Sequence, residues 1–100
     1  MSTSTEKQAI VNFGSIVGGW SPYEKLTAKE KAIFQEATRG LLGVQYTPEL
    51  VSKQVVSGTN YRFKCIASPV TPKPLRYHVI VQIYAPLKGE PFITHIFPEL

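Results

Sequence analysis

Aspartate is missing from this sequence of 100 residues, and cysteine occurs only once. Without aspartate, and with no serine–histidine–acid or paired-carboxylate pattern, an enzyme is the least expected class. The single cysteine, Cys65, excludes an intrachain disulfide and fits a reducing compartment. One cysteine and two histidines are too few for the usual structural zinc sites, so we expect no metal and no cofactor.

Long apolar runs are also missing. The apolar stretches are too short for a transmembrane helix, and no lysine- or arginine-led apolar leader stands at the N-terminus. We therefore expect a cytoplasmic protein that does not bind membranes. A leader removed ahead of Met1 would instead make it a secreted protein.

Positive charge is present but spread along the chain. The net charge is +4, and scattered cations favour a solvated surface over a nucleic-acid site, so we expect no nucleic-acid partner. The alternative is a polyanion site built on the following cations: Lys53, Arg62, Lys64, Arg76 and His78. Stacking of bases would also need exposed aromatic rings among these cations. Tyr84 is the one aromatic residue that the alternation of the strands makes available on that face.

A chain of this length is expected to form a single domain, residues 1–100, around one core. Residues 1–15 are expected to be a flexible N-terminal segment, because residues 1–8 are rich in serine and threonine. The apolar segment 9–17 ends at Gly18 and Gly19, and two adjacent glycines interrupt helix and strand alike.

One helix is predicted in the first half of the chain. Thr27-Ala28-Lys29-Glu30 is a capping box, which predicts the start of the helix. Helix formers continue through about Leu42, and the helix is expected to end near Gly43. Its apolar stripe at helical spacing consists of Ile33, Phe34, Ala37, Leu41 and Val44.

A β-hairpin is predicted in the centre of the chain. Two β-branched, alternating segments, 50–56 and 61–67, flank the turn residues Ser57-Gly58-Thr59-Asn60. Its tip would expose Val55 and Val56, whereas hairpin tips are normally polar. An exposed apolar tip indicates a surface that another molecule covers.

The remaining strands complete an antiparallel sheet. The first strand is expected from Tyr46, with Pro48 at an edge or bulge, and further strands at 75–84 and 92–97. Three prolines in 68–74 exclude a central strand there. Alternation places Tyr61, Phe63, Cys65 and Ala67 on the core face, so Cys65 is expected to be a buried, inert thiol. One long helix packed across four or five such strands is an α+β roll.

Three segments resemble the cystatins, inhibitors of papain-like cysteine proteases. Gln54-Val55-Val56-Ser57-Gly58 resembles the Gln-x-Val-x-Gly signature of the first cystatin hairpin, and Thr59-Asn60-Tyr61 is similar to the intracellular, disulfide-free stefin branch. Ile16-Val17-Gly18-Gly19 resembles the N-terminal trunk, with Gly18 matching the trunk glycine. Pro86-Leu87 follows the stefin pattern in the second hairpin, while Trp20 replaces the small residue or proline common in the family.

The resemblance implies a cystatin-like roll and a reversible, tight-binding inhibitor of papain-like, cathepsin-type cysteine proteases. Such an inhibitor occludes the active-site cleft with its trunk and two hairpin loops. The alternative is a non-inhibitory binding module of the same fold. The resemblance also implies a monomer that can exchange its first hairpin in a domain-swapped dimer. The implied protease contacts are Ile16, Val17, Gly18, Gly19, Gln54, Val55, Val56, Ser57, Gly58, Pro86 and Leu87.

Overall fold

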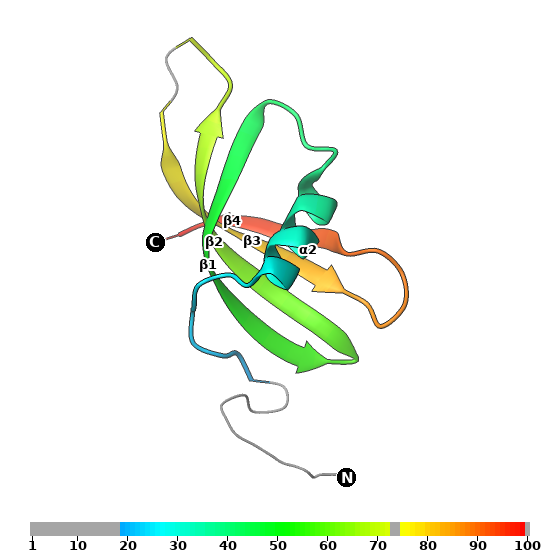
Figure 1. Cartoon of the computed structure of the whole chain (residues 1–100). Coiled ribbons are helices and arrows are strands. Elements are labelled where there is room, and N and C mark those ends of the chain that lie inside the picture. The colour runs from blue at the N-terminus through cyan, green and yellow to red at the C-terminus, as the bar shows by residue number, and fades with distance from the viewer. Residues whose placement is uncertain (1–18, 73–74, 100) are drawn as a thin grey trace, which may run out of the picture.

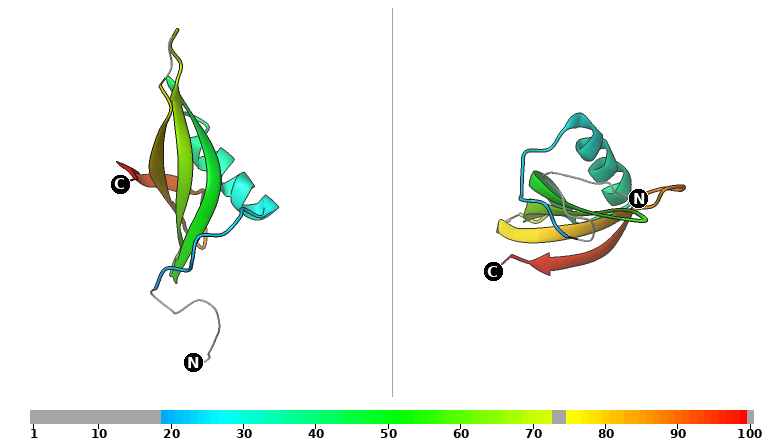
Figure 2. Two further views of the ribbon diagram at one scale, coloured as in Figure 1. Left: turned by 90° about the vertical axis from the view of Figure 1, so that its left-hand side faces the viewer. Right: turned by 90° about the horizontal axis from the view of Figure 1, so that it is seen from below.

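The computed structural model describes residues 19–72 and 75–99. Within these residues one helix precedes four strands, which pair antiparallel in the order β1-β2-β3-β4, and the helix lies across one face of the sheet (Figures 1 and 2). The predicted α+β class is therefore confirmed, and the described part of the sheet has four strands. The elements are α2 (Ala28–Thr38), β1 (Val44–Val56), β2 (Gly58–Pro69), β3 (Tyr77–Ala85) and β4 (Phe92–Pro98).

The helix begins as predicted but ends early. The backbone amide of Thr27 donates to Glu30 at 2.8 Å, and the amide of Glu30 donates to the Thr27 hydroxyl at 3.5 Å, so the capping box is confirmed. The helix stops at Thr38, whose hydroxyl donates to the carbonyl of Phe34 at 2.8 Å and competes with further helical turns. The prediction that Leu41 and Val44 extend the helical stripe is therefore wrong. Leu41 is exposed, and Val44 begins β1.

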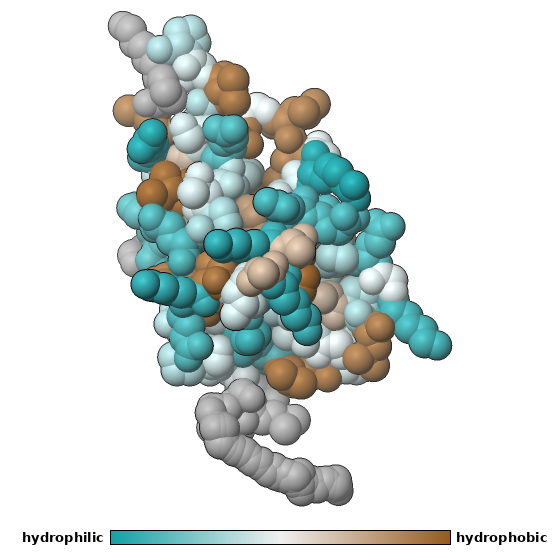
Figure 3. All heavy atoms as spheres, viewed as in Figure 1, coloured by the Kyte–Doolittle hydropathy of each residue, from teal (hydrophilic) through white to brown (hydrophobic). Residues whose placement is uncertain are grey.

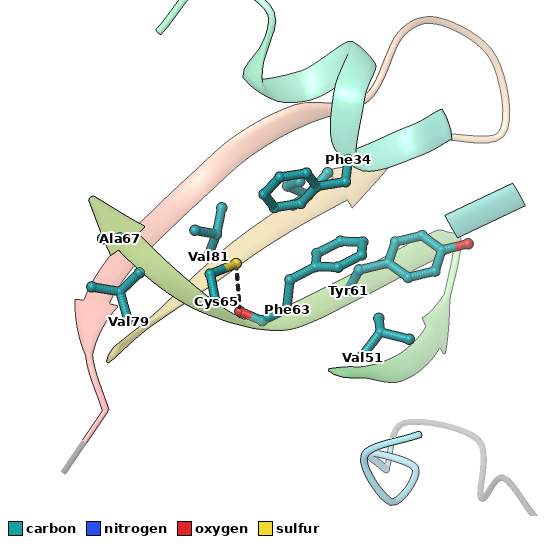
Figure 4. Close-up of a cluster of buried hydrophobic side chains, with 9 residues drawn as sticks. Phe34, Val51, Tyr61, Phe63, Cys65, Ala67, Val79 and Val81 are labelled. Atoms are coloured by element: carbon teal, nitrogen blue, oxygen red, sulfur yellow. Dashed lines mark hydrogen bonds between the residues drawn. The ribbon is translucent and has the colours of Figure 1, made fainter. Parts of the chain in front are cut away.

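The core lies between α2 and the sheet. The Phe63 ring on β2 packs edge-on against Phe34 of α2, with centroids 4.9 Å apart, and stacks with Tyr61 at 5.9 Å (Figure 4). The alternation predicted for the core face of β2 is confirmed, because its four expected core residues are all buried. Among the described residues, the buried core consists of Phe34, Val51, Tyr61, Phe63, Cys65, Ala67, Val79, Val81 and Ile83.

The third strand differs from prediction at its start, whereas the first strand agrees with prediction at Pro48. β3 begins at Tyr77, and Leu75, which the alternation places with the core residues, is 80% exposed. This end of the sheet extends beyond the helix (Figure 1). β1 is an edge strand with a register shift between Pro48 and Leu50, which confirms the predicted edge or bulge position of Pro48.

The hairpin between β1 and β2 is tighter than predicted. Val56 pairs with Gly58, so Ser57 alone separates the strands, and Thr59 and Asn60 belong to β2. A turn this short requires unusual backbone angles, and Gly58 has φ +92°. The absence of a Cβ lets glycine adopt this left-handed conformation at little cost, which explains why the turn can close at one residue.

No helix in the described residues, 19–72 and 75–99, is both long and apolar enough to cross a membrane.

Candidate functional site

The turn of the first hairpin lies directly against the connection between β3 and β4. A Cβ built on Gly58 would lie 2.6 Å from the carbonyl oxygen of Ala85 and 3.1 Å from the Cα of Pro86. The hydroxyl of Tyr84 donates to the carbonyl of Ser57. The two hairpin ends are therefore in van der Waals contact, and the missing side chain of Gly58 makes that contact possible.

The first described residues lie beside the same hairpin. Trp20 forms an antiparallel bridge with Gln54, and the amide of Ser21 donates to the carbonyl of Lys53 at 2.8 Å. Further along, Glu24 and Val51 exchange backbone hydrogen bonds of 2.9 and 2.8 Å. Residues 19–24, which we call the strap, thus run antiparallel along the edge of β1 and cover part of it.

These contacts bring three distant segments together at one end of the molecule (Figures 1 and 2). We call this end the loop edge. Among the predicted contact residues, only Ile16, Val17 and Gly18 lie outside the described residues. The loop edge consists of Gly19 and Trp20 from the strap, Gln54, Val55, Val56, Ser57 and Gly58 from the first hairpin, and Pro86 and Leu87 from the β3–β4 connection.

The loop edge exposes apolar side chains. Val55 and Val56 are each 44% exposed and Leu87 is 80% exposed, whereas Gly58 is buried. In Figure 3 apolar surface appears along the lower margin of the described atoms. Apolar residues grouped at adjacent loops, instead of scattered singly, are typical of a binding surface.

The stem of the first hairpin is held firmly behind its tip. The side-chain amide of Asn60 donates to the side-chain oxygen of Gln54 at 2.9 Å, across a pair of facing residues. One residue earlier, the Lys53 ammonium lies 2.7 Å from the carboxylate of Glu30, which is 4% exposed, at the start of α2. This ion pair joins the helix to β1 next to the loop edge.

The ion pair also shifts the titration of both its members. Burial opposes ionisation of Glu30, but its hydrogen bonds with Lys53 and Thr27 outweigh this and hold the Glu30 pKa below its usual value. The hydrogen bond with Glu30 outweighs the opposing burial of Lys53 and raises its pKa. Both groups are therefore charged at neutral pH, and the pair is preserved there.

The outer face of the sheet, opposite α2, differs from the predicted basic cluster. The Cζ of Arg62 lies 4.2 Å from the centroid of the Trp20 ring, and the Nζ of Lys64 lies 4.3 Å from that of Tyr23. The ring of Phe97 also lies near Arg62. The prediction that Tyr84 is the only aromatic residue among these cations is therefore wrong. The prediction failed because backbone pairing with β1 places the strap beside the sheet. The sequence of residues 19–24 shows no alternation that would predict this pairing.

Three of the five cations considered for polyanion binding have partners of their own. Lys53 pairs with Glu30, Arg62 donates to Gln82, and Lys64 lies 3.5 Å from the carboxylate of Glu99. The other two, Arg76 and His78, are exposed. Within residues 19–72 and 75–99 no three histidine, cysteine or acidic side chains come together as metal ligands.

Cys65 lies in the core, as predicted. It is 1% exposed, its thiol contacts the carbonyl of Phe63 at 3.4 Å, and burial raises its pKa to about 12 (Figure 4). A thiol that stays protonated and inaccessible at neutral pH cannot act as a nucleophile or ligand.

Comparison of the chain with protein-family models, with curated proteins and with solved structures finds no match.

Proposed function

We propose that this protein is a reversible, tight-binding inhibitor of papain-like cysteine proteases. The observation that carries the proposal is the contact between the first hairpin and the β3–β4 connection at Gly58, with the strap beside them. The three segments that resemble the cystatin trunk and hairpins could have lain apart. The described parts of all three instead lie at one edge, as an inhibitor that fills a cleft requires.

In the proposed mechanism the loop edge enters the active-site cleft as a wedge. Val55, Val56 and Leu87 would lose their remaining exposure to water, and full burial of such a side chain contributes about 1.5–3 kcal/mol. Because Gly58 has no side chain, the two hairpin ends can enter the cleft together. The strap adds Gly19 and Trp20 to one side of this wedge.

Inhibition in this mechanism is occlusion, not chemistry on the inhibitor. The wedge places turns and side chains in the cleft, and no peptide bond of the inhibitor needs to reach the catalytic cysteine. A hairpin already held by the Glu30–Lys53 pair and the Gln54–Asn60 hydrogen bond loses little conformational entropy on docking. We therefore expect tight binding without cleavage of the inhibitor.

The direct test is a titration of active papain with the purified protein. We expect stoichiometric inhibition that substrate relieves by competition, and recovery of intact inhibitor after dissociation. Trypsin serves as the control and should be unaffected. Absence of inhibition towards papain and cathepsin-type enzymes would refute the proposal, and binding without inhibition would support the alternative of a non-inhibitory module.

Replacing Cys65 with alanine should separate stability from function. Cys65→Ala removes a buried sulfur from the core and should lower the free energy of unfolding by about 1–2 kcal/mol. It should leave papain inhibition unchanged, because Cys65 lies far inside the fold and its thiol stays protonated. Urea denaturation and the papain titration measure the two effects. A folded variant that no longer inhibits would contradict the inert role of this thiol.

The domain-swapped dimer stays a prediction. Its hinge would be residues 56–60, and straightening them would remove the hairpin tip with Val56 and Ser57 from the loop edge. A swapped dimer should therefore not inhibit papain, which size-exclusion chromatography followed by titration of each fraction would check.

A further inference from the structure

Arg62 makes contacts on the outer sheet face that the proposed wedge does not use directly. Its Cζ lies 4.2 Å from the centroid of the Trp20 ring and 5.6 Å from that of Phe97. Its Nε donates to the side-chain oxygen of Gln82 at 2.9 Å. Two rings and an amide oxygen therefore leave the guanidinium few orientations, and a planar guanidinium stacks on a ring better than an ammonium does.

Arg62 belongs to a row of facing residues that also holds the strap. Ser52 pairs with Arg62, and Arg62 pairs with Gln82, across β1, β2 and β3. The Ser52 hydroxyl donates to the carbonyl of Ser21 at 2.5 Å, and the amide of Lys53 donates to the hydroxyl of Ser21 at 2.9 Å. The strap is thus held along the edge of β1 by hydrogen bonds and from the sheet face through the Trp20 ring.

This double attachment lies next to the loop edge. Trp20 bridges with Gln54, two residues from the hairpin tip, and Gly19 comes directly before it. The bridge to Gln54, the hydrogen bonds of Ser21 and the contact between Trp20 and Arg62 therefore act together on the position of Gly19. A residue on the sheet face can in this way help to hold Gly19 and Trp20 beside the two hairpin ends.

We propose that Arg62 is a positioning residue which, by holding the Trp20 ring, aligns Gly19 and Trp20 with the two hairpin ends for entry into the protease cleft. The inference rests on the proposed function. Under this proposal, Arg62 acts through Trp20 and makes no contact with the protease itself. Alignment before docking lowers the entropic cost of binding, so its loss weakens inhibition without unfolding the protein.

Fluorescence tests the contact itself, because Trp20 is the only tryptophan of the chain. In Arg62→Met we expect the emission to shift to longer wavelength and acrylamide quenching to increase. Arg62→Lys keeps the charge but not the planar group, and should behave in the same way. Arg76→Met removes the same charge at an exposed position and should change neither signal. Unchanged emission in both folded Arg62 variants would overturn the proposal.

Inhibition of papain tests the role. Arg62→Met should weaken inhibition about tenfold, within the range of coupling between interacting residues, and Arg76→Met should not. The decisive measurement is a double-mutant cycle in the full chain with Gly19→Asp, a change at the first residue of the strap. Once Arg62 no longer aligns the strap, the loss caused by Gly19→Asp should shrink by about threefold or more. Leu87→Ala, in the other hairpin end, should remain additive with Arg62→Met.

The outcomes separate the two proposals. Additivity of Arg62→Met with Gly19→Asp would overturn the positioning role while leaving the inhibitor intact. A wild-type protein that inhibits no papain-like protease would refute the proposed function and the positioning role together, whereas the fluorescence would still report whether Arg62 holds Trp20.

Discussion

Val56→Asp is expected to weaken inhibition of papain by about a hundredfold or more. In the free protein Val56 is 44% exposed at the hairpin tip, so a carboxylate there stays hydrated and the fold is preserved. In the proposed complex the same carboxylate would be buried without a partner, which costs several kcal/mol even after relaxation. At about 1.4 kcal/mol per tenfold change, the dissociation constant rises by at least two decades.

The chain offers a matched control at its other end. Val70 is 72% exposed and follows β2, so it lies away from the loop edge. Val70→Asp makes the same chemical change and the same change of net charge, but it should leave inhibition within about twofold of wild type, as surface substitutions usually do. Circular dichroism checks that both variants fold. Equal inhibition by the two folded variants would show that the hairpin tip does not contact the protease.

Gly58→Ala is expected to destabilise the protein and to separate the two hairpin ends. The new methyl group would lie 2.6 Å from the carbonyl oxygen of Ala85 and 3.1 Å from the Cα of Pro86, both backbone atoms that cannot rotate away. Overpacking of this kind costs about 1–3 kcal/mol. The positive φ of +92° adds about 1–3 kcal/mol of backbone strain. Inhibition should fall as well, because relief of the clash moves Ser57 away from Pro86.

Gly43→Ala isolates the part of this cost that comes from the backbone. Gly43 has φ +87°, close to that of Gly58, but a Cβ there would meet no atom within 4 Å. It should therefore show the backbone strain alone and inhibit papain normally. Urea denaturation of both variants gives the difference. If Gly58→Ala is no less stable than Gly43→Ala, the close contact between the two hairpin ends does not exist in solution.

The elements that local chemistry specifies were predictable from the sequence. The capping box of Thr27 and Glu30 uses hydrogen bonds between residues three positions apart, so its effect is visible in a short window. The alternation along β2 and β3 reports which residues face the core, because successive side chains of a strand point to opposite faces. Pro48 was placed at an edge or bulge because proline cannot donate to a neighbouring strand.

Other predictions failed where several local preferences compete. The apolar spacing at Leu41 and Val44 continues the helical period, but the Thr38 hydroxyl and the glycines at 40 and 43 end the helix first. Four turn residues suggested a longer loop than the single Ser57 that separates β1 from β2. The cystatin resemblance and the protease contacts that it implies stay predictions.

By itself the sequence determined the helix start, the core face of the sheet and an apolar first hairpin. Each of these features depends on interactions between residues a few positions apart, or on the two-residue period with which side chains alternate along a strand. Only the tertiary structure decided that the strap, the hairpin and the β3–β4 connection form one edge, and that the Arg62 guanidinium lies over the Trp20 ring. Ser21 and Ser52 are 31 residues apart, and Ser57 and Tyr84 are 27 apart. Contacts over such separations arise from strand register and from the space left by a missing side chain at Gly58, and neither leaves a periodic signal in the chain.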